Sequence, residues 1–144
     1  METYVYDINP VPASRPRVSK YGTYYLATYR EFKNKMLELT AINRHPIPWS
    51  GPLSVEVVCN VKKPKTTERT SPNGDVDNFA KAVLDSLNGI LWDDDDQIIE
   101  LKASKHFTID NPNIIVRVGS YVEQTSGTGK VRKLCIKRTR PKQR

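Results

Sequence analysis

The chain has 144 residues, the size of one ordinary domain, and carries 23 Lys and Arg against 16 Asp and Glu, a net charge of +7. No apolar run approaches the roughly 18 residues of a membrane-spanning helix, and the first residues lack the features of a signal peptide. We therefore expect a cytoplasmic protein with no membrane partner. The two cysteines, Cys59 and Cys135, have no further ligand at metal spacing, so neither a zinc site nor a disulfide framework is supported.

The first half of the chain is predicted to form a strand, a loop, a helix and a second strand. Residues 4–8 predict a short strand, and three prolines within residues 9–22 predict a loop after it. Apolar side chains at helical spacing predict a helix over residues 28–42, with Thr28 as its N-cap. From Leu53 to Val61 apolar and polar residues alternate, which is typical of a half-buried strand.

The second half is predicted to add one helix and two strands. An apolar stripe predicts a helix over residues 78–87, with Asp77 or Asn78 as its N-cap. Alternating patterns then predict strands over residues 97–107 and 113–118. The order βαβαββ indicates an α+β fold, a small mixed sheet with two helices.

Charge is unevenly distributed along the chain. Residues 1–74 carry eleven basic and six acidic side chains. Residues 75–122 carry four basic and nine acidic side chains, and residues 121–144 carry eight basic and one acidic side chain. We expect one domain over residues 1–122 and a basic, flexible tail over residues 123–144. A basic half beside an acidic centre suits a polyanion such as nucleic acid, although a basic tail alone is often a solvated segment with no dedicated partner.

Seven aspartates lie between Asp75 and Asp96, and their spacing suggests a shared site. Asp75 and Asp77 flank one residue in what we expect to be extended chain before the helix, so both should project to one side. Lys81 lies one helical turn beyond Asp77 and can reach back toward that spot. The run Asp93–Asp96 follows the helix, and a short return can bring one or two of its carboxylates nearby.

Converging carboxylates of this kind suit Mg²⁺, with Mn²⁺ as a substitute, and phosphate substrates. Such a site could hydrolyse a phosphodiester while Lys81 neutralises charge on the phosphate. Each element also has an ordinary interpretation. A DxD before a helix is often a cap, four aspartates are often a solvated turn, and Lys81 with Asp85 can form a helix-surface ion pair.

The same residues resemble a known family. The segments DVDNFAK and WDDDDQIIE, with Asp85 between them, are similar to the signature of the RusA family of Holliday junction resolvases, and PVPASRPRV resembles the N-terminal loop of phage-type members. The resemblance implies a homodimeric, Mg²⁺-dependent endodeoxyribonuclease that nicks two opposed strands of a four-way DNA junction in recombination and repair. It also implies that Asp75 and Asp77 are catalytic aspartates, Asn78 is the motif's asparagine and Lys81 is its essential lysine.

The third catalytic aspartate depends on the register within WDDDD. Aligning the family's pattern on Gln97 selects Asp94 and Asp95, with Asp95 as the first choice, so the predicted metal ligands are Asp75, Asp77, Asp95 and Asp94. Strand alternation would place Asp95 and Asp94 on opposite sides but does not say which side faces the other aspartates. Additional aspartates at positions 93 and 96 leave a shift of one residue open.

Basic side chains in the two predicted loops are candidates for DNA phosphate contacts: Arg15, Arg17, Lys20, Lys62, Lys63, Lys65 and Arg69. Tyr21, Tyr24 and Tyr25 are interleaved with them and are candidates for stacking on bases. The segment SGTGK at residues 126–130 lacks the full phosphate-binding loop pattern, so we expect no nucleotide cofactor.

Three other functions fit parts of this pattern. They are a non-catalytic junction-binding module with a structural metal, a transferase with a DxD site, and a nuclease that cuts flaps or other branched DNA.

Overall fold

A computed structural model describes residues 1–14, 17–20, 22–24, 27–43 and 47–123. These residues form two α-helices, α1 (Ala27–Asn43) and α2 (Val76–Leu87), and a short 3-10 helix, η1 (Asp95–Gln97). The main sheet contains β1 (Glu2–Tyr6), β4 (Leu53–Lys62), β5 (Ile98–Thr108) and β6 (Asn113–Ser120), and a separate hairpin contains β2 (Arg17–Ser19) and β3 (Gly22–Tyr24). Among the described helices none is long and apolar enough to cross a membrane.

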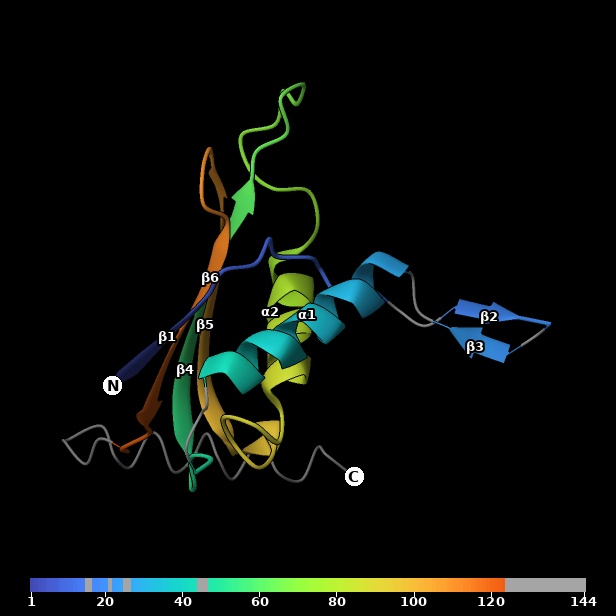
Figure 1. Cartoon of the computed structure of the whole chain (residues 1–144). Coiled ribbons are helices and arrows are strands. Elements are labelled where there is room, and N and C mark those ends of the chain that lie inside the picture. Colours follow the sequence, from blue (N-terminus) through green and yellow to red (C-terminus); the bar gives the residue numbers. More distant parts are fainter. Residues whose placement is uncertain (15–16, 21, 25–26, 44–46, 124–144) are drawn as a thin grey trace, which may run out of the picture.

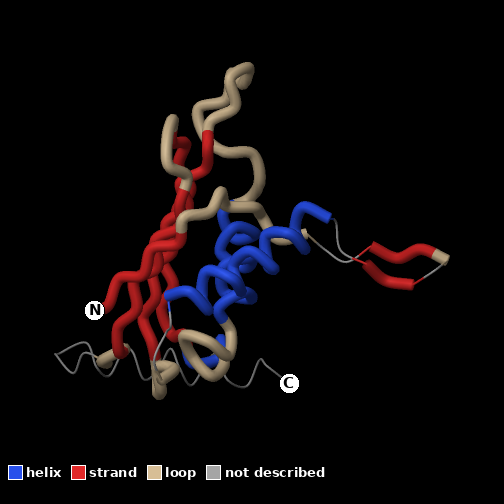
Figure 2. The backbone as a smooth tube through the Cα atoms, viewed as in Figure 1, coloured by secondary structure: helices blue, strands red, loops and turns tan. Residues whose placement is uncertain are grey.

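The main sheet is mixed and is covered on one side. Its strand order is β1-β6-β4-β5; β6 is antiparallel to both β1 and β4, whereas β4 and β5 are parallel. Both helices lie against the same face of this sheet (Figures 1 and 2). The predicted α+β fold with a small mixed sheet and two helices is confirmed, and so is the order of these six elements.

The core lies between the sheet and the helices. Every second side chain of β4, from Leu53 to Cys59, is buried, as the alternation predicts. The helices contribute apolar side chains at helical spacing, including Phe32 and Met36 from α1 and Val83 from α2. Full burial of each large apolar side chain stabilises the fold by about 1.5–3 kcal/mol, so this layer fixes α2 against the sheet.

One predicted loop contains regular structure. Strands β2 and β3 pair as an antiparallel hairpin within and just beyond residues 9–22, where the prolines predicted only a loop. Each strand has three residues, too few for an alternating pattern to be recognised in the sequence. In Figure 1 the hairpin lies beyond the N-terminal end of α1, away from the main sheet.

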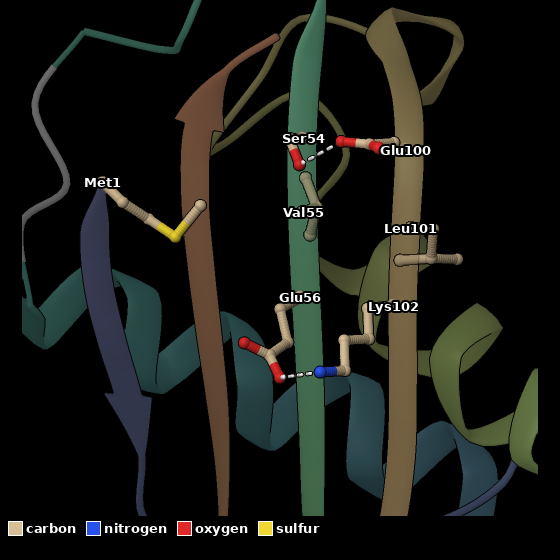
Figure 3. Close-up of a pocket in the computed structure, with 7 residues that line it drawn as sticks. All are labelled: Met1, Ser54, Val55, Glu56, Glu100, Leu101 and Lys102. Atoms are coloured by element: carbon tan, nitrogen blue, oxygen red, sulfur yellow. Dashed lines mark hydrogen bonds and ion pairs between the residues drawn. The ribbon is translucent and has the colours of Figure 1, made fainter.

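The opposite face of the main sheet carries polar side chains that pair with one another. Glu56 binds Arg117 at 3.1 Å and Lys102 at 4.0 Å, and the Ser54 hydroxyl donates to Glu100 at 3.1 Å. Figure 3 shows how Ser54, Glu56, Glu100 and Lys102 line a shallow hollow across β4 and β5. Among the described residues, Glu56 on this face is thus paired with two cations, Arg117 and Lys102.

Helix α2 is the crossover between the parallel strands β4 and β5. Its N-terminus therefore lies toward the end where β4 finishes, and its C-terminus lies toward the start of β5. The helix packs against β4, β5 and α1. Residues on the face of α2 that looks toward β5 are thus held at fixed positions along the edge of the sheet, because β5 is the edge strand.

Candidate active site at helix α2 and strand β5

Helix α2 begins at Val76, two residues earlier than predicted, and this changes the geometry of the first two aspartates. Asp75 is the N-cap, and Asp77 lies in the first turn. The expectation that they flank an extended residue is therefore wrong, because the backbone has already entered the helix at Val76. Backbone N–H groups of Asn78 and Phe79 donate to the Asp75 carbonyl at 3.0 and 3.2 Å.

The carboxylates of Asp75 and Asp77 remain available at this helix end. The Asp75 side chain makes no capping hydrogen bond, and both residues are exposed. The Asp77 carboxylate accepts from the backbone N–H of Asn78 at 3.0 Å. The unpaired N–H groups and dipole of a helix N-terminus stabilise nearby negative charge by about 0.3–1 kcal/mol, and both side chains lie at this end of α2.

The turn before α2 depends on Gly74. Its φ is +111°, a conformation that L side chains rarely adopt, and an added Cβ would lie 3.2 Å from the Phe79 ring and 3.2 Å from Pro12. We expect Gly74→Ala to lower the free energy of unfolding by about 1–3 kcal/mol through backbone strain and crowding. Urea denaturation measures this. Gly51→Ala is the control, since Gly51 also has positive φ but no atom within 4 Å; an equal loss would contradict the crowding.

A pocket of about 450 Å³ lies between α2 and the edge of the sheet. Its ionisable side chains are Asp77, Lys81, Asp85 and Asp95, and the other lining residues are Val76, Ala80, Leu84, Leu101 and Ala103. The first three follow one another at intervals of four residues, so they form one stripe along α2. Three carboxylates and one ammonium thus share a pocket whose remaining surface is apolar.

Lys81 forms an ion pair with Asp85, one helical turn further along α2. Its ammonium lies 3.5 Å from the Asp85 carboxylate, which also accepts a hydrogen bond from the Tyr29 hydroxyl of α1 at 3.3 Å. This is the helix-surface ion pair that the sequence allowed, rather than a contact back to Asp77. Lys81 is 65% exposed, and such pairs contribute only about 0.3–0.5 kcal/mol, so the ammonium can turn to an incoming phosphate at little cost.

Hydrogen bonds fix the register of the WDDDD segment. Asp94 is the N-cap of η1: its carboxylate accepts from the Asp96 N–H at 3.2 Å, and the Gln97 side chain accepts from the Asp94 N–H at 2.9 Å. The Gln97 amide then donates to the carbonyls of Trp49 and Gly51 at 3.0 and 2.9 Å. Since β5 begins only at Ile98, strand alternation does not govern the aspartates.

Asp95 is the member of this run that lines the pocket. Its carboxylate accepts from the Trp92 indole N–H at 2.5 Å, and its backbone N–H donates to the Asn88 side chain at 2.9 Å. Asp93 and Asp96 are exposed, and neither they nor Asp94 line the pocket. The roles predicted for Asp95 and Asp94 as metal ligands stay predictions. Asp95 lines the pocket, whereas Asp94 is the N-cap of η1.

The pKa of Asp95 is raised above its usual value. Partial burial is the largest cause, and the negative charges of Asp85 and Asp94 add to it; the hydrogen bond from Trp92 and the charge of Lys81 act in the opposite direction. A carboxylate with a raised pKa at a cluster of like charges gains most from a nearby cation. The electrostatics of the pocket therefore favour cation binding beside Asp95.

Oxygen donors make the pocket chemically suitable for a divalent cation of the Mg²⁺ type, which takes one or two carboxylates and completes its coordination with water and phosphate oxygens. The carboxylates are spread along α2, however: Asp77 and Asp85 are separated by eight residues, about 12 Å of helix. Within the described part of the chain, no three acidic, histidine or cysteine side chains are close enough to hold one ion. The expected convergence of three or four donors on one point is not shown.

The predicted DNA contacts fall in two regions. Lys62 ends β4, and Lys63, Lys65 and Arg69 are exposed on the loop that follows it, which projects past the end of the sheet (Figure 1). The Lys63 N–H donates to the Thr108 carbonyl at 2.9 Å, which ties the base of this loop to β5.

The second region is the hairpin. Lys20 is exposed between β2 and β3, and Arg17 belongs to β2, but its side chain is not described. Arg15, Tyr21 and Tyr25 lie outside the described residues, as does the segment 126–130, and the side chain of Tyr24 in β3 is likewise not described.

Three supporting residues were not singled out in the sequence. Tyr29 binds Asp85, and Trp92 and Asn88 hold Asp95 from its two sides. Trp92 is fully buried, so the indole fixes the carboxylate to the core. The pattern gave no signal for these contacts because they depend on distances across the fold. Asp85, by contrast, continues the four-residue spacing that begins at Asp77.

The fold and the pocket together define a small α+β domain with a carboxylate-lined site at the edge of a mixed sheet. Residues 7–119 match the family model described as Endodeoxyribonuclease RusA, and the chain belongs to this endodeoxyribonuclease family. A protein of Bacillus subtilis (strain 168), described as uncharacterized protein YqaN, is 31% identical over 76% of this chain and 89% of its own length. The predicted family membership is confirmed.

Proposed function

We propose that the protein is a Mg²⁺-dependent endonuclease that resolves four-way DNA junctions by paired nicks in opposed strands, in recombination and repair. The observation that carries this proposal is the pocket lined by Asp77, Lys81, Asp85 and Asp95 in a member of an endodeoxyribonuclease family. Acidic oxygen donors beside the exposed ammonium of Lys81 suit a metal-bound phosphodiester.

The residues proposed to hold Mg²⁺ are Asp77 and Asp95, which line the pocket, and Asp75 at the N-cap of α2, with Asp94 as a predicted further ligand. Their carboxylates are not gathered around one point in the described residues, so binding of one ion by three of them requires these side chains to turn toward it. When bound, the metal supplies Lewis acidity and a water of lowered pKa. Side chains of the protein orient Asp95 and the scissile phosphate. Trp92 and Asn88 hold Asp95, and Lys81 leaves Asp85 to neutralise a non-bridging oxygen of the scissile phosphate.

The basic loop after β4 is proposed to position the DNA. Lys62, Lys63, Lys65 and Arg69 are exposed on the chain that leads directly into Asp75. Cations at these positions would contact phosphates without reading the DNA sequence. DNA binding through them would become weaker as the salt concentration rises. The hairpin residues Arg15, Arg17 and Lys20 are proposed as a second set of contacts.

A homodimer is proposed because two nicks in opposed strands require two sites related by two-fold symmetry. Among the described strands, β5 pairs on one side only, and its other edge supports an interface beside the pocket. Ile99 and Leu101 are 55% and 46% exposed there, and Leu101 lines the pocket itself. An edge strand with exposed apolar side chains is a surface that a second chain can cover.

A cleavage comparison tests the proposal. We expect the protein to cut a four-way junction at paired positions in Mg²⁺, to be inactive in EDTA, and to cut the junction at least about ten-fold faster than a Y fork of the same arm sequences at physiological salt, a difference of about 1.4 kcal/mol in barrier. Binding without cleavage in Mg²⁺ and in Mn²⁺ would indicate a junction-binding module. Equal rates on both substrates would indicate a nuclease for branched DNA in general.

A further inference from the structure

A lysine on β5 ties that strand to the turn before α2. Lys105 pairs in register with the buried Cys59 of β4 and is only partly exposed. Its ammonium donates to the Pro72 carbonyl at 2.8 Å and also to the Gly74 carbonyl. Two of its three N–H donors therefore hold two carbonyls of a single turn.

The charge of Lys105 is not used in an ion pair within the described part of the chain. Lys35, Lys81 and Lys102 each have a carboxylate within 4.0 Å, whereas the contacts described for the Lys105 ammonium are the two carbonyl oxygens. Partial burial of an ammonium is costly unless polar groups replace water. The turn is thus specifically arranged to receive this cation, since hydrogen bonds from charged donors are about twice as strong as neutral ones.

The turn that Lys105 holds leads directly into the proposed metal site. The Gly74 carbonyl belongs to the peptide bond that joins Gly74 to Asp75, so its hydrogen bond fixes the plane from which Asp75 emerges. A Cβ added at Gly74 would lie 3.2 Å from Phe79 and from Pro12, so these side chains leave little room for this turn to shift. The Asp75 side chain makes no capping bond of its own, so its direction depends on how this backbone is held.

We propose that Lys105 is a positioning residue that orients the Asp75 carboxylate for divalent-cation binding. The proposal rests on the proposed function in taking Asp75 as a metal ligand. Lys105 does not contact the substrate; it acts through the Gly74–Asp75 peptide. Loss of a group that orients a metal ligand typically weakens metal binding about 10- to 100-fold, and we expect a loss in the lower part of that range because Asp75 is one ligand of several.

The test compares Lys105→Met with Lys102→Met. Both lysines lie on β5, but Lys102 is 81% exposed on the opposite face, and its ammonium lies 4.0 Å from Glu56. Mn²⁺ binding is measured by electron paramagnetic resonance on the full chain without DNA, and junction affinity is measured in EDTA. We expect Lys105→Met to bind Mn²⁺ about ten-fold more weakly, with unchanged junction affinity, and Lys102→Met to match the wild type in both.

A second variant separates positioning from folding. Lys105→Arg keeps a cation with several donors and is expected to recover most of the Mn²⁺ affinity. Lys105→Gln has an uncharged amide on a shorter side chain and should lie between Arg and Met. The Arg and Gln variants also test the proposal if Lys105→Met does not fold. Wild-type Mn²⁺ binding in Lys105→Met or Lys105→Gln would overturn the proposal, as would a defect confined to junction affinity. If the wild type binds Mn²⁺ but cuts no junction, the proposed function fails while this comparison still decides the role of Lys105.

Discussion

Asp77→Asn is expected to abolish junction cleavage while leaving junction binding intact. Asp77 lines the pocket from the first turn of α2, and its replacement removes a negative charge that a divalent cation needs. We expect the single-turnover rate in Mg²⁺ to fall at least about 100-fold, roughly 3 kcal/mol of barrier. Electrophoretic mobility shift in EDTA should show equal or slightly tighter binding, because one charge that repels phosphate is gone.

The fold should tolerate this change. The asparagine oxygen can still accept the Asn78 N–H bond, so only the interaction with the helix dipole is lost, about 0.3–1 kcal/mol. Asp110→Asn, an exposed aspartate in the β5–β6 turn, is the control and should cut at the wild-type rate. Wild-type cleavage by Asp77→Asn would show that the pocket at α2 is not the active site.

Asp95→Asn is expected to lose cleavage to a similar extent while making the metal-free protein more stable at neutral pH. Burial and nearby negative charge raise the pKa of Asp95, so folding favours its protonated form. The stabilisation from protonated Asp95 is fully present below about pH 4, the unfolded value, and is lost as pH rises through the raised folded pKa. Asparagine is neutral throughout and avoids this loss.

The pH dependence provides the measurement. Thermal unfolding of metal-free protein should show a higher midpoint for Asp95→Asn than for the wild type at pH 7, and this difference should shrink toward pH 4. The asparagine oxygen can still accept the Trp92 indole N–H, so the packing is retained. Asp93→Asn, whose exposed side chain does not line the pocket, should keep cleavage and show no such pH-dependent gain. A lower midpoint for Asp95→Asn at pH 7 would mean that the carboxylate stabilises the fold.

The sequence determined the main elements of the fold because their patterns are long enough to be read locally. The alternation in β4 and the apolar stripe of α2 both predicted which side chains are buried, and the strand and helix order followed. The four-residue spacing of Asp77, Lys81 and Asp85 likewise placed these side chains on one helix face, and the structure places all three in one pocket. Periodicity is a property of the backbone, so it needs no knowledge of distant contacts.

The structure shows which of the aspartates line the pocket, which the local pattern alone left open. Four successive aspartates carry no local signal that distinguishes them, and the assignment of Asp95 to the pocket comes from Trp92, Asn88 and Gln97, which fix the turn before β5. The turn before α2 is held in the same way by Lys105, about thirty residues away. A side chain's direction in a turn is set by hydrogen bonds across the fold, whose donors and acceptors are far apart in the chain. The sequence therefore determined which residues could form the site, and only the packed structure decided which of them face it.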